Sequence, residues 1–134
     1  MPMDERFAEP RYPFAEHIDM RMLDWSEGHA RFELPLAPFT QNRHGSPHGG
    51  LHASLLDTVM GYAGCWTGDP EKAQMCLTLS LNVQYLSRPK GRVFLAEGWK
   101  TGGGRSTFFA EGEVRDDTGE LIARGSGTFR YRRS

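Results

Sequence analysis

The sequence predicts an α+β protein in which an antiparallel sheet covers one long helix. A single stretch, residues 51–66, repeats apolar residues at helical spacing. Four runs after it have the composition of strands and are separated by turn residues, and two shorter runs precede it. With 134 residues, of which 38% are hydrophobic, the chain is long enough to bury a core of its own, so we expect a single domain.

The beginning of the chain differs in composition from the remainder. Residues 1–16 carry three of the prolines among charged side chains, and we expect a flexible N-terminal arm there. The single domain is predicted to span residues 17–134.

Two short strands and a loop are predicted between the arm and the helix. The runs 18–25 and 29–36 are separated by Ser26-Glu27-Gly28, which favours a β-hairpin. Residues 39–50 contain Gly45, Pro47, Gly49 and Gly50 and are therefore predicted to form a loop.

The predicted helix has two different faces. Its large apolar residues share one side, namely Leu51, Leu55, Val59, Tyr62 and Trp66. Asp57 lies on the other side, where its neighbours are all small: Ala53, Ser54, Thr58, Gly61 and Gly64. A solvated face usually carries Lys, Glu or Arg, and this one has none. We therefore favour a face that another backbone or a ligand approaches closely over a solvated face.

The strands after the helix form a meander. Residues 77–85 alternate apolar and polar side chains, which is the pattern of a strand with one buried face, here formed by Leu77, Leu79, Leu81, Val83 and Tyr85. Three more strands are predicted at residues 92–100, 105–115 and 121–131.

Composition and charge exclude several classes of protein. Sixteen basic and seventeen acidic residues give a formal charge of −1, so nothing calls for nucleic acid or an anionic membrane as a partner. No apolar run is long enough to span a bilayer, and the first residues lack the order of a signal peptide, so we expect a cytoplasmic protein. Cys65 and Cys76 show neither CxxC spacing nor a paired framework, which favours reduced, structural thiols.

The most specific part of the sequence is residues 42–50, which lead into Asp57. Gly49 and Gly50 free the backbone at the start of the helix, where unpaired N–H groups can hold a carbonyl oxygen that gains negative charge. Asp57 follows Gly49 by eight residues, or about 12 Å along a helix, too far to serve the same carbonyl. A second copy of the chain could supply it, so a site shared across a two-fold interface is the economical geometry.

This stretch resembles the hotdog-fold acyl-CoA thioesterases, in particular the phenylacetic-acid-degradation thioesterase type. The match runs from Asn42 to Ala63 and reads N-x-x-G-x-x-H-G-G-x-x-x-x-x-x-D-x-x-x-G-x-A. The resemblance implies a hotdog fold, one long central helix wrapped by an antiparallel β-sheet. It also implies hydrolysis of acyl-CoA, aryl-acyl-CoA included, by a homodimer that pairs further into a tetramer. Coenzyme A would enter as part of the substrate, and no separate cofactor is implied.

The same resemblance assigns roles to individual residues. Gly49 would offer its backbone N–H to the thioester carbonyl, assisted by Asn42. Asp57 of the partner protomer would act as the nucleophile or as the base that activates water. Thr78 matches the position of a hydroxyl group near that water.

Basic residues in two turns are candidates for binding the nucleotide end of coenzyme A. They are Arg88, Lys90 and Arg105, and in the related thioesterases these turns border the nucleotide groove. Gly50, Gly104 and Ser106 complete the candidate set. The alternative is that these are ordinary solvated turn residues.

Histidines allow two further interpretations. His48 could contact the thioester or steer a proton, or it could bond the local backbone and shape the turn. His44, His48 and His52 have the spacing of zinc ligands on a helix. The three glycines and one proline among them oppose a continuous helix, so we predict no metal site.

Other chemistry is disfavoured. Ser46 and Ser54 lack the surroundings of a hydrolase nucleophile, and the glycines at 102–104 precede a strand rather than a helix, unlike a phosphate loop. The alternative function is a non-catalytic protein that binds or senses acyl-CoA. Asp57 favours the enzyme over this alternative, because a protein that only binds gains nothing from a carboxylate beside an anionic ligand.

Overall fold

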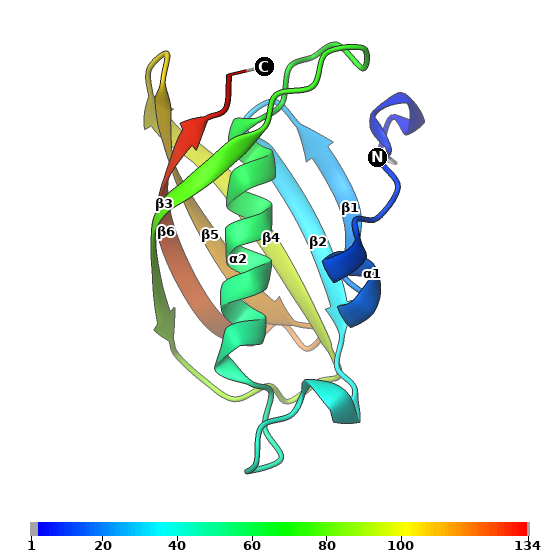
Figure 1. The fold of residues 1–134 in the computed structure, drawn as a ribbon. Coiled ribbons are helices and arrows are strands. Elements are labelled where there is room, and N and C mark those ends of the chain that lie inside the picture. Colours follow the sequence, from blue (N-terminus) through cyan, green and yellow to red (C-terminus); the bar gives the residue numbers. More distant parts are fainter. Residues whose placement is uncertain (1–2, 134) are drawn as a thin grey trace.

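The computed structural model describes residues 3–133 and has the predicted α+β architecture, a six-stranded antiparallel sheet curved around one long helix (Figure 1). The helix, α2, spans Gly49–Gly64. The strands lie in the order β1-β2-β4-β5-β6-β3. Their bounds are β1 Arg21–Ser26, β2 His29–Pro35, β3 Cys76–Tyr85, β4 Val93–Gly103, β5 Thr107–Asp116 and β6 Leu121–Tyr131. The hotdog fold is therefore confirmed.

The N-terminal segment contains packed elements, which differs from the expected loose arm. A 3₁₀ turn, η1, covers Glu5–Phe7, and a short helix, α1, covers Pro13–Ile18. Phe7 packs against Trp66 at 4.0 Å between ring centroids and against Trp25 at 6.4 Å. Pro13 occupies the first position of α1, where a missing N–H costs nothing, so this proline begins a helix rather than preventing one.

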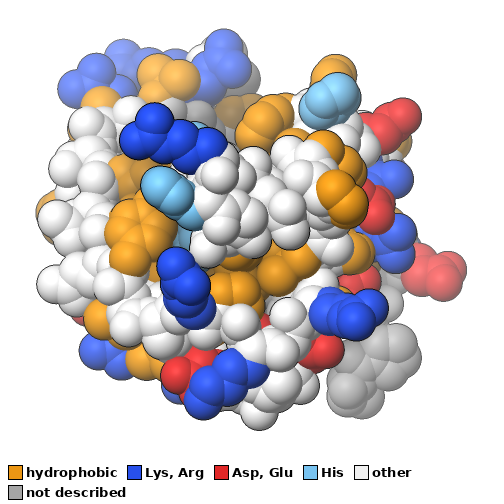
Figure 2. Space-filling model, turned by 90° about the horizontal axis from the view of Figure 1, so that it is seen from below, with side chains coloured by type: hydrophobic (Ala, Val, Ile, Leu, Met, Phe, Trp, Pro, Cys, Tyr) orange, Lys and Arg blue, Asp and Glu red, His pale blue; other side chains and the backbone are white. Residues whose placement is uncertain are grey.

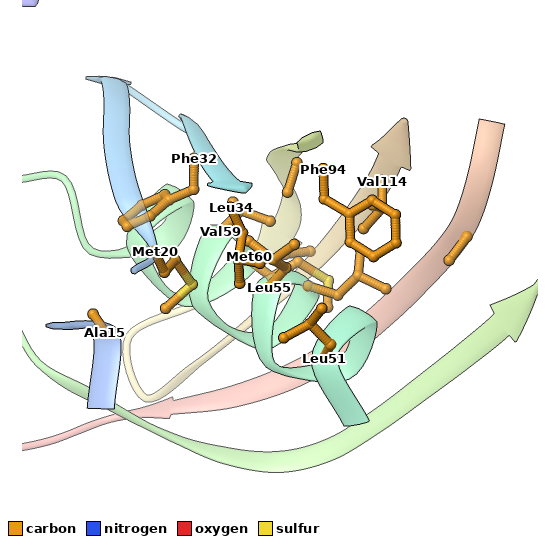
Figure 3. Close-up of a cluster of buried hydrophobic side chains, with 14 of the residues drawn as sticks. Ala15, Met20, Phe32, Leu34, Leu51, Leu55, Val59, Met60, Phe94 and Val114 are labelled. Carbon is orange, nitrogen blue, oxygen red and sulfur yellow. The ribbon is translucent and has the colours of Figure 1, made fainter. Parts of the chain in front are cut away.

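The core fills the space between α2 and the concave face of the sheet (Figure 3). A row of cross-strand neighbours, Gly98, Gly112 and Gly125, lies beneath the helix. A Cβ atom at Gly98 would lie 2.7 Å from the backbone of Val59, and one at Gly112 would lie 3.0 Å from Leu56. Glycine at these positions therefore lets the helix approach the sheet closely. The fully buried side chains of α2 are Leu55, Leu56, Val59 and Met60.

Strand β3 forms one edge of the sheet and pairs only with β6 among the described residues. Its register shifts between Thr78 and Ser80, which is a β-bulge. Leu77, Leu79 and Tyr85 are 51%, 49% and 53% exposed, so the prediction of one continuous buried face is wrong for these three residues. The bulge adds one residue and reverses the alternation, because Leu81 and Val83 beyond it do pack on the core.

A compact loop precedes α2. After the 3₁₀ turn η2, Pro38–Thr40, the chain folds back on itself through an isolated bridge between Gln41 and Pro47. The N–H of His48 donates to the carbonyl of Thr40 at 2.8 Å, which closes the loop directly before the helix. Within residues 3–133, no helix is both long and apolar enough to cross a membrane.

Candidate active site

Asp57 and Thr78 meet where α2 passes β3. The Thr78 hydroxyl donates to Oδ1 of Asp57 at 2.6 Å. The β-bulge turns Thr78 toward the helix, because without it Thr78 would lie on the opposite face from Leu81 and Val83. The structure thus brings together two residues that the sequence motif placed far apart in the chain.

The pair borders a cavity of about 280 Å³. Aromatic side chains and small residues line it together, including Tyr12, Trp25, Tyr62, Gly61, Cys65 and Cys76. The small face of α2 therefore does meet a space that another group can enter, as the sequence indicated for Thr58 and Gly61. Gly64 differs, because it is buried against the ring of Phe108.

The two thiols of this cavity are free. The neighbouring thiol of Cys76, together with burial, raises the pKa of the Cys65 thiol, so Cys65 stays protonated. Cys65 therefore acts as a small neutral residue of the cavity wall.

The N-terminus of α2 carries the second group of predicted residues. The Nδ1 atom of His48 accepts from the N–H of Gly50 at 2.9 Å, so His48 caps the helix and shapes the turn. The N–H of Gly50 is therefore engaged within the chain, and the role of Gly50 in binding the substrate stays a prediction. Within the described residues the N–H of Gly49 donates to no protein atom, which leaves it available to a ligand.

Two neighbours fix the position of this turn. The Tyr85 hydroxyl donates to the carbonyl of Gly49 at 2.5 Å. The side-chain oxygen of Asn42 accepts from the N–H groups of His44 and Ser46 at 2.8 and 3.2 Å. The side-chain oxygen of Asn42 is thus engaged by hydrogen bonds within the loop, and its amide nitrogen is the atom that can donate to a ligand. Tyr85 was not predicted as a site residue, because nothing in a strand pattern tells which ring reaches a distant helix terminus.

The three histidines do not form a metal centre. No group of three His, Cys, Asp or Glu residues in the described part of the chain could hold a metal ion. His52 is buried with ring centroids 5.0 Å from Tyr85 and 4.9 Å from Phe94. Burial lowers the pKa of His52, which favours a neutral ring in the core.

Gly49 and Asp57 do not face one carbonyl within a single chain. Both lie on α2, and eight residues of helix separate them by about 12 Å along the axis. The predicted separation of Gly49 and Asp57 along the helix is therefore present in the fold.

The predicted nucleotide-binding residues fall into two groups at opposite ends of the sheet. Arg88 and Lys90 lie in the turn before β4, near the N-terminus of α2, whereas Gly104, Arg105 and Ser106 form the turn after β4 at the top left of Figure 1. A single chain thus does not bring them together. Lys90 is partly engaged, because its Nζ lies 3.2 Å from Glu120.

The end of the molecule near Arg88 is basic and hollowed. Figure 2, which views this end, shows Lys, Arg and His side chains spread over it, with Asp and Glu side chains toward its edges. A cavity of about 450 Å³ is lined there by Arg88, Arg92 and the loop before α2, with no acidic residue among its lining residues. Asp116 shapes the turn by accepting from the N–H groups of Lys90 and Gly91 at 2.6 and 2.8 Å. Burial would raise the pKa of Asp116, but these bonds and those from Thr118 outweigh it and hold the pKa well below its usual range.

Comparison with known proteins agrees with this geometry. The family model of the thioesterase superfamily matches residues 44–123. The structure of the conserved protein PA5202 from Pseudomonas aeruginosa superposes with a TM-score of 0.82 at 26% identity, covering 96% of this chain and 98% of that one. The BH2602 protein from Bacillus halodurans, solved with CoA, gives a TM-score of 0.79 at 27% identity over 97% of this chain and 85% of that one.

A third structure bears on the finer resemblance. The Escherichia coli PaaI protein from the phenylacetic acid degradation operon has a TM-score of 0.81, with 92% of this chain and 87% of that chain covered. The two sequences are only 18% identical, so this likeness is one of fold and does not single out that branch. The match to the family model spans more than half of the 134 residues and includes both Gly49 and Asp57, and on that basis the chain belongs to the thioesterase superfamily.

Proposed function

We propose that this protein hydrolyses the thioester bond of an acyl-CoA at a site shared by two protomers. The observation that carries the proposal is the pair of chemical groups on α2: the unengaged N–H of Gly49 at its N-terminus, and Asp57 midway along it, held by Thr78 beside a cavity. An oxyanion donor and a positioned carboxylate are the groups that hydrolysis of a thioester requires.

The chemistry follows from these groups. The thioester carbonyl lies against the N–H of Gly49, with the amide nitrogen of Asn42 as a second donor. Asp57 either attacks the carbonyl carbon to give an acyl-enzyme anhydride that water hydrolyses, or takes a proton from the water that attacks. In both versions the C–S bond breaks, coenzyme A leaves as its thiol, and the acyl group is released as a carboxylic acid.

The edge of the sheet supports the shared site. Strand β3 presents exposed Leu77 and Leu79 at an edge that could pair with another strand. Antiparallel pairing of β3 with the β3 of a second copy reverses the direction of the neighbouring α2 helices. It would therefore place Gly49 of one protomer toward Asp57 of the other. A dimer of dimers would extend the same assembly.

A dimer would also bring the two basic turns of different chains close to each other. The turn of Arg88 and the turn of Arg105 lie at opposite ends of one chain, and a two-fold axis brings opposite ends of two chains together. Together they could bind the phosphates of the coenzyme A moiety. The Bacillus halodurans relative was solved with CoA, which supports CoA as the ligand class but not the particular residues.

The decisive experiment is the replacement Asp57→Asn, assayed by thiol release from a panel of acyl-CoAs. Asparagine keeps the size of the side chain but is neither a base nor a nucleophile, so we expect kcat to fall by about 10² to 10⁴ while acyl-CoA still binds. Glu27→Gln, in the exposed β1–β2 turn, is the matched control for loss of a carboxylate and should keep wild-type turnover.

Two results would contradict the proposal. An Asp57→Asn variant that keeps more than a tenth of wild-type turnover would exclude the role of Asp57. A wild-type protein that binds acyl-CoA but releases no thiol from any member of the panel would instead support the alternative, a non-catalytic acyl-CoA binding or sensing protein.

A further inference from the structure

A second cavity adjoins the one that Asp57 borders, because the two share lining residues. We call the first, of about 280 Å³, the Asp57 cavity. The second, which we call the N-terminal cavity, measures about 200 Å³. Its walls include the apolar side chains of Ala15, Met20, Met22 and Phe32, together with residues of the segment before α1.

Three residues line both cavities: Glu9, Tyr12 and Tyr62. The Tyr62 hydroxyl donates to Oε1 of Glu9 at 2.8 Å, and the Tyr12 hydroxyl lies 3.1 Å from the hydroxyl oxygen of Thr58, the residue after Asp57. These two contacts tie the N-terminal segment to α2. The three side chains therefore form a partition between the two cavities.

The part of the partition on the helix is tightly packed, whereas the part on the N-terminal segment is held by few contacts. The Tyr62 ring packs against Trp25 and Phe32 at ring-centroid distances of 5.1 and 5.2 Å. The backbone carbonyl of Tyr62 also accepts a hydrogen bond from Nε1 of Trp25. Glu9 is exposed, and the bond to Tyr62 is its only side-chain hydrogen bond within the described residues.

We propose that Glu9, Tyr12 and Tyr62 limit the length of the acyl group, so that the substrates are acyl-CoAs whose acyl group ends within the Asp57 cavity. This inference rests on the proposed function. The size of the Asp57 cavity suits a short chain or a single ring, and its aromatic walls provide apolar contact for either. A longer chain meets two obstacles: the partition blocks its path, and its end would strip water from the carboxylate of Glu9.

The test removes the partition and measures chain-length preference. Straight-chain acyl-CoAs from two to sixteen carbons are compared by kcat/KM in the wild type and in Glu9→Ala/Tyr12→Ala. In the wild type, kcat/KM should rise by about fourfold per methylene while the chain fills the Asp57 cavity, and then fall. In the double variant the maximum should move to longer chains, and the ratio of long-chain to short-chain kcat/KM should rise at least tenfold.

Two further variants make the result specific. Tyr62→Phe keeps the ring and breaks only the bond to Glu9, so it should shift the maximum in the same direction by a smaller amount. Glu5→Ala removes an exposed carboxylate of the same segment that lines neither cavity, and it should keep the wild-type profile. Inhibition by S-alkyl-CoA thioethers, which cannot be hydrolysed, gives an independent measure, because long thioethers should bind the opened variants more tightly.

The outcomes separate this inference from the function on which it rests. If the wild type hydrolyses no acyl-CoA, the proposed function fails. If it hydrolyses acyl-CoAs of all lengths equally well, or if neither the double variant nor Tyr62→Phe moves the maximum or the thioether affinities, thioester hydrolysis stands and the partition is overturned.

Discussion

The hydrogen bond from Thr78 distinguishes the two carboxylate oxygens of Asp57. Thr78 engages Oδ1 at 2.6 Å, and Oδ2 has no protein partner within the described residues. One oxygen atom is therefore fixed in place while the other can act on a carbonyl carbon or a water molecule. A hydroxyl donor suits this task better than a basic side chain, because it orients the carboxylate without pairing its charge.

Thr78→Val tests whether the hydroxyl group of Thr78 is needed to orient Asp57. Valine has nearly the same shape as threonine but cannot donate, so Asp57 would lose its orientation. We expect kcat to fall by about tenfold with little change in KM, since the loss of a charge-assisted hydrogen bond has about this magnitude. Thr78→Ser should restore most of the rate. Equal rates for the valine and serine variants would show that the hydroxyl is not needed.

His52 makes the stability of the fold depend on pH. Burial lowers the pKa of His52 in the folded protein, whereas the unfolded chain has the ordinary value near 6.5. Below that value the unfolded state binds the proton more readily, so acidification favours unfolding. We expect the free energy of unfolding to fall by up to about 1.4 kcal/mol per pH unit below pH 6.5, until the folded pKa is reached.

Urea denaturation of His52→Gln between pH 7 and 5 checks this expectation. The variant should lose less stability over this range than the wild type, because it removes the group that must be protonated in the unfolded state. His44→Gln, at an exposed loop position, is the control and should follow the wild type. A His52→Gln curve parallel to that of the wild type would contradict the prediction.

Element by element, local patterns predicted what kind of structure forms and where, but not the details set by distant contacts. The alternation over 77–85 predicted β3 within one residue of its observed bounds. It placed Leu77 and Leu79 on the wrong face, because a bulge depends on pairing with β6 and leaves no mark in a single strand. Thr78 was predicted as a site residue only from the family resemblance. The bulge explains physically why its side chain faces the helix.

The N-terminal segment shows the same limit. Its prolines and charges suggested an arm without packed elements, yet Phe7 packs between two tryptophans that are 18 and 59 residues further along the chain. No local pattern contains such a contact. Glu9 and Tyr12 escaped notice for the same reason, although both line the Asp57 cavity.

Two glycines of α2 offer a matched test of helix packing. A Cβ atom at Gly61 would lie 3.5 Å from the sulfur of Cys76, an ordinary contact, whereas one at Gly64 would lie 2.0 Å from the ring of Phe108. Gly61→Ala should therefore raise the free energy of unfolding by about 0.5–1 kcal/mol, the gain in helix propensity. Gly64→Ala should lower it by about 1–3 kcal/mol, because the ring must move in a packed core.

Chemical denaturation of the two variants measures both effects. Gly61→Ala also narrows the Asp57 cavity, so its kcat/KM should decrease more for a bulky acyl-CoA than for acetyl-CoA. If Gly64→Ala proves as stable as Gly61→Ala, the close packing of α2 against Phe108 is contradicted.

At the scale of the whole molecule, the groups that the proposed hydrolysis would use lie apart in a single chain. Gly49 and Asp57 lie two helical turns apart, and the two basic turns lie at opposite ends of β4. The helix spacing made the first separation predictable from the sequence. The second became visible only in the fold, since the strand order determines which turns share an end of the sheet.

Mixing two inactive variants tests whether a second copy completes the site. Asp57→Asn removes the carboxylate, and Gly49→Pro removes the N–H donor. Proline suits this position, because Gly49 is the first residue of α2 and His48 before it is extended at ψ 135°. In a mixed dimer one site receives both defects and the other receives none. Random exchange makes half of the dimers mixed, each with one working site, so we expect about a quarter of wild-type thiol release.

The control is each variant alone at the same total concentration, which should stay inactive. Light scattering should give a mass of at least two chains, and tagged protomers should show that mixed dimers form. The reason for expecting rescue is geometric: if Gly49 and Asp57 of one chain served the same carbonyl, every protomer in the mixture would carry one fatal defect and no combination could recover activity. A mass near that of one 15.1 kDa chain, or mixed dimers without thiol release, would contradict the shared site.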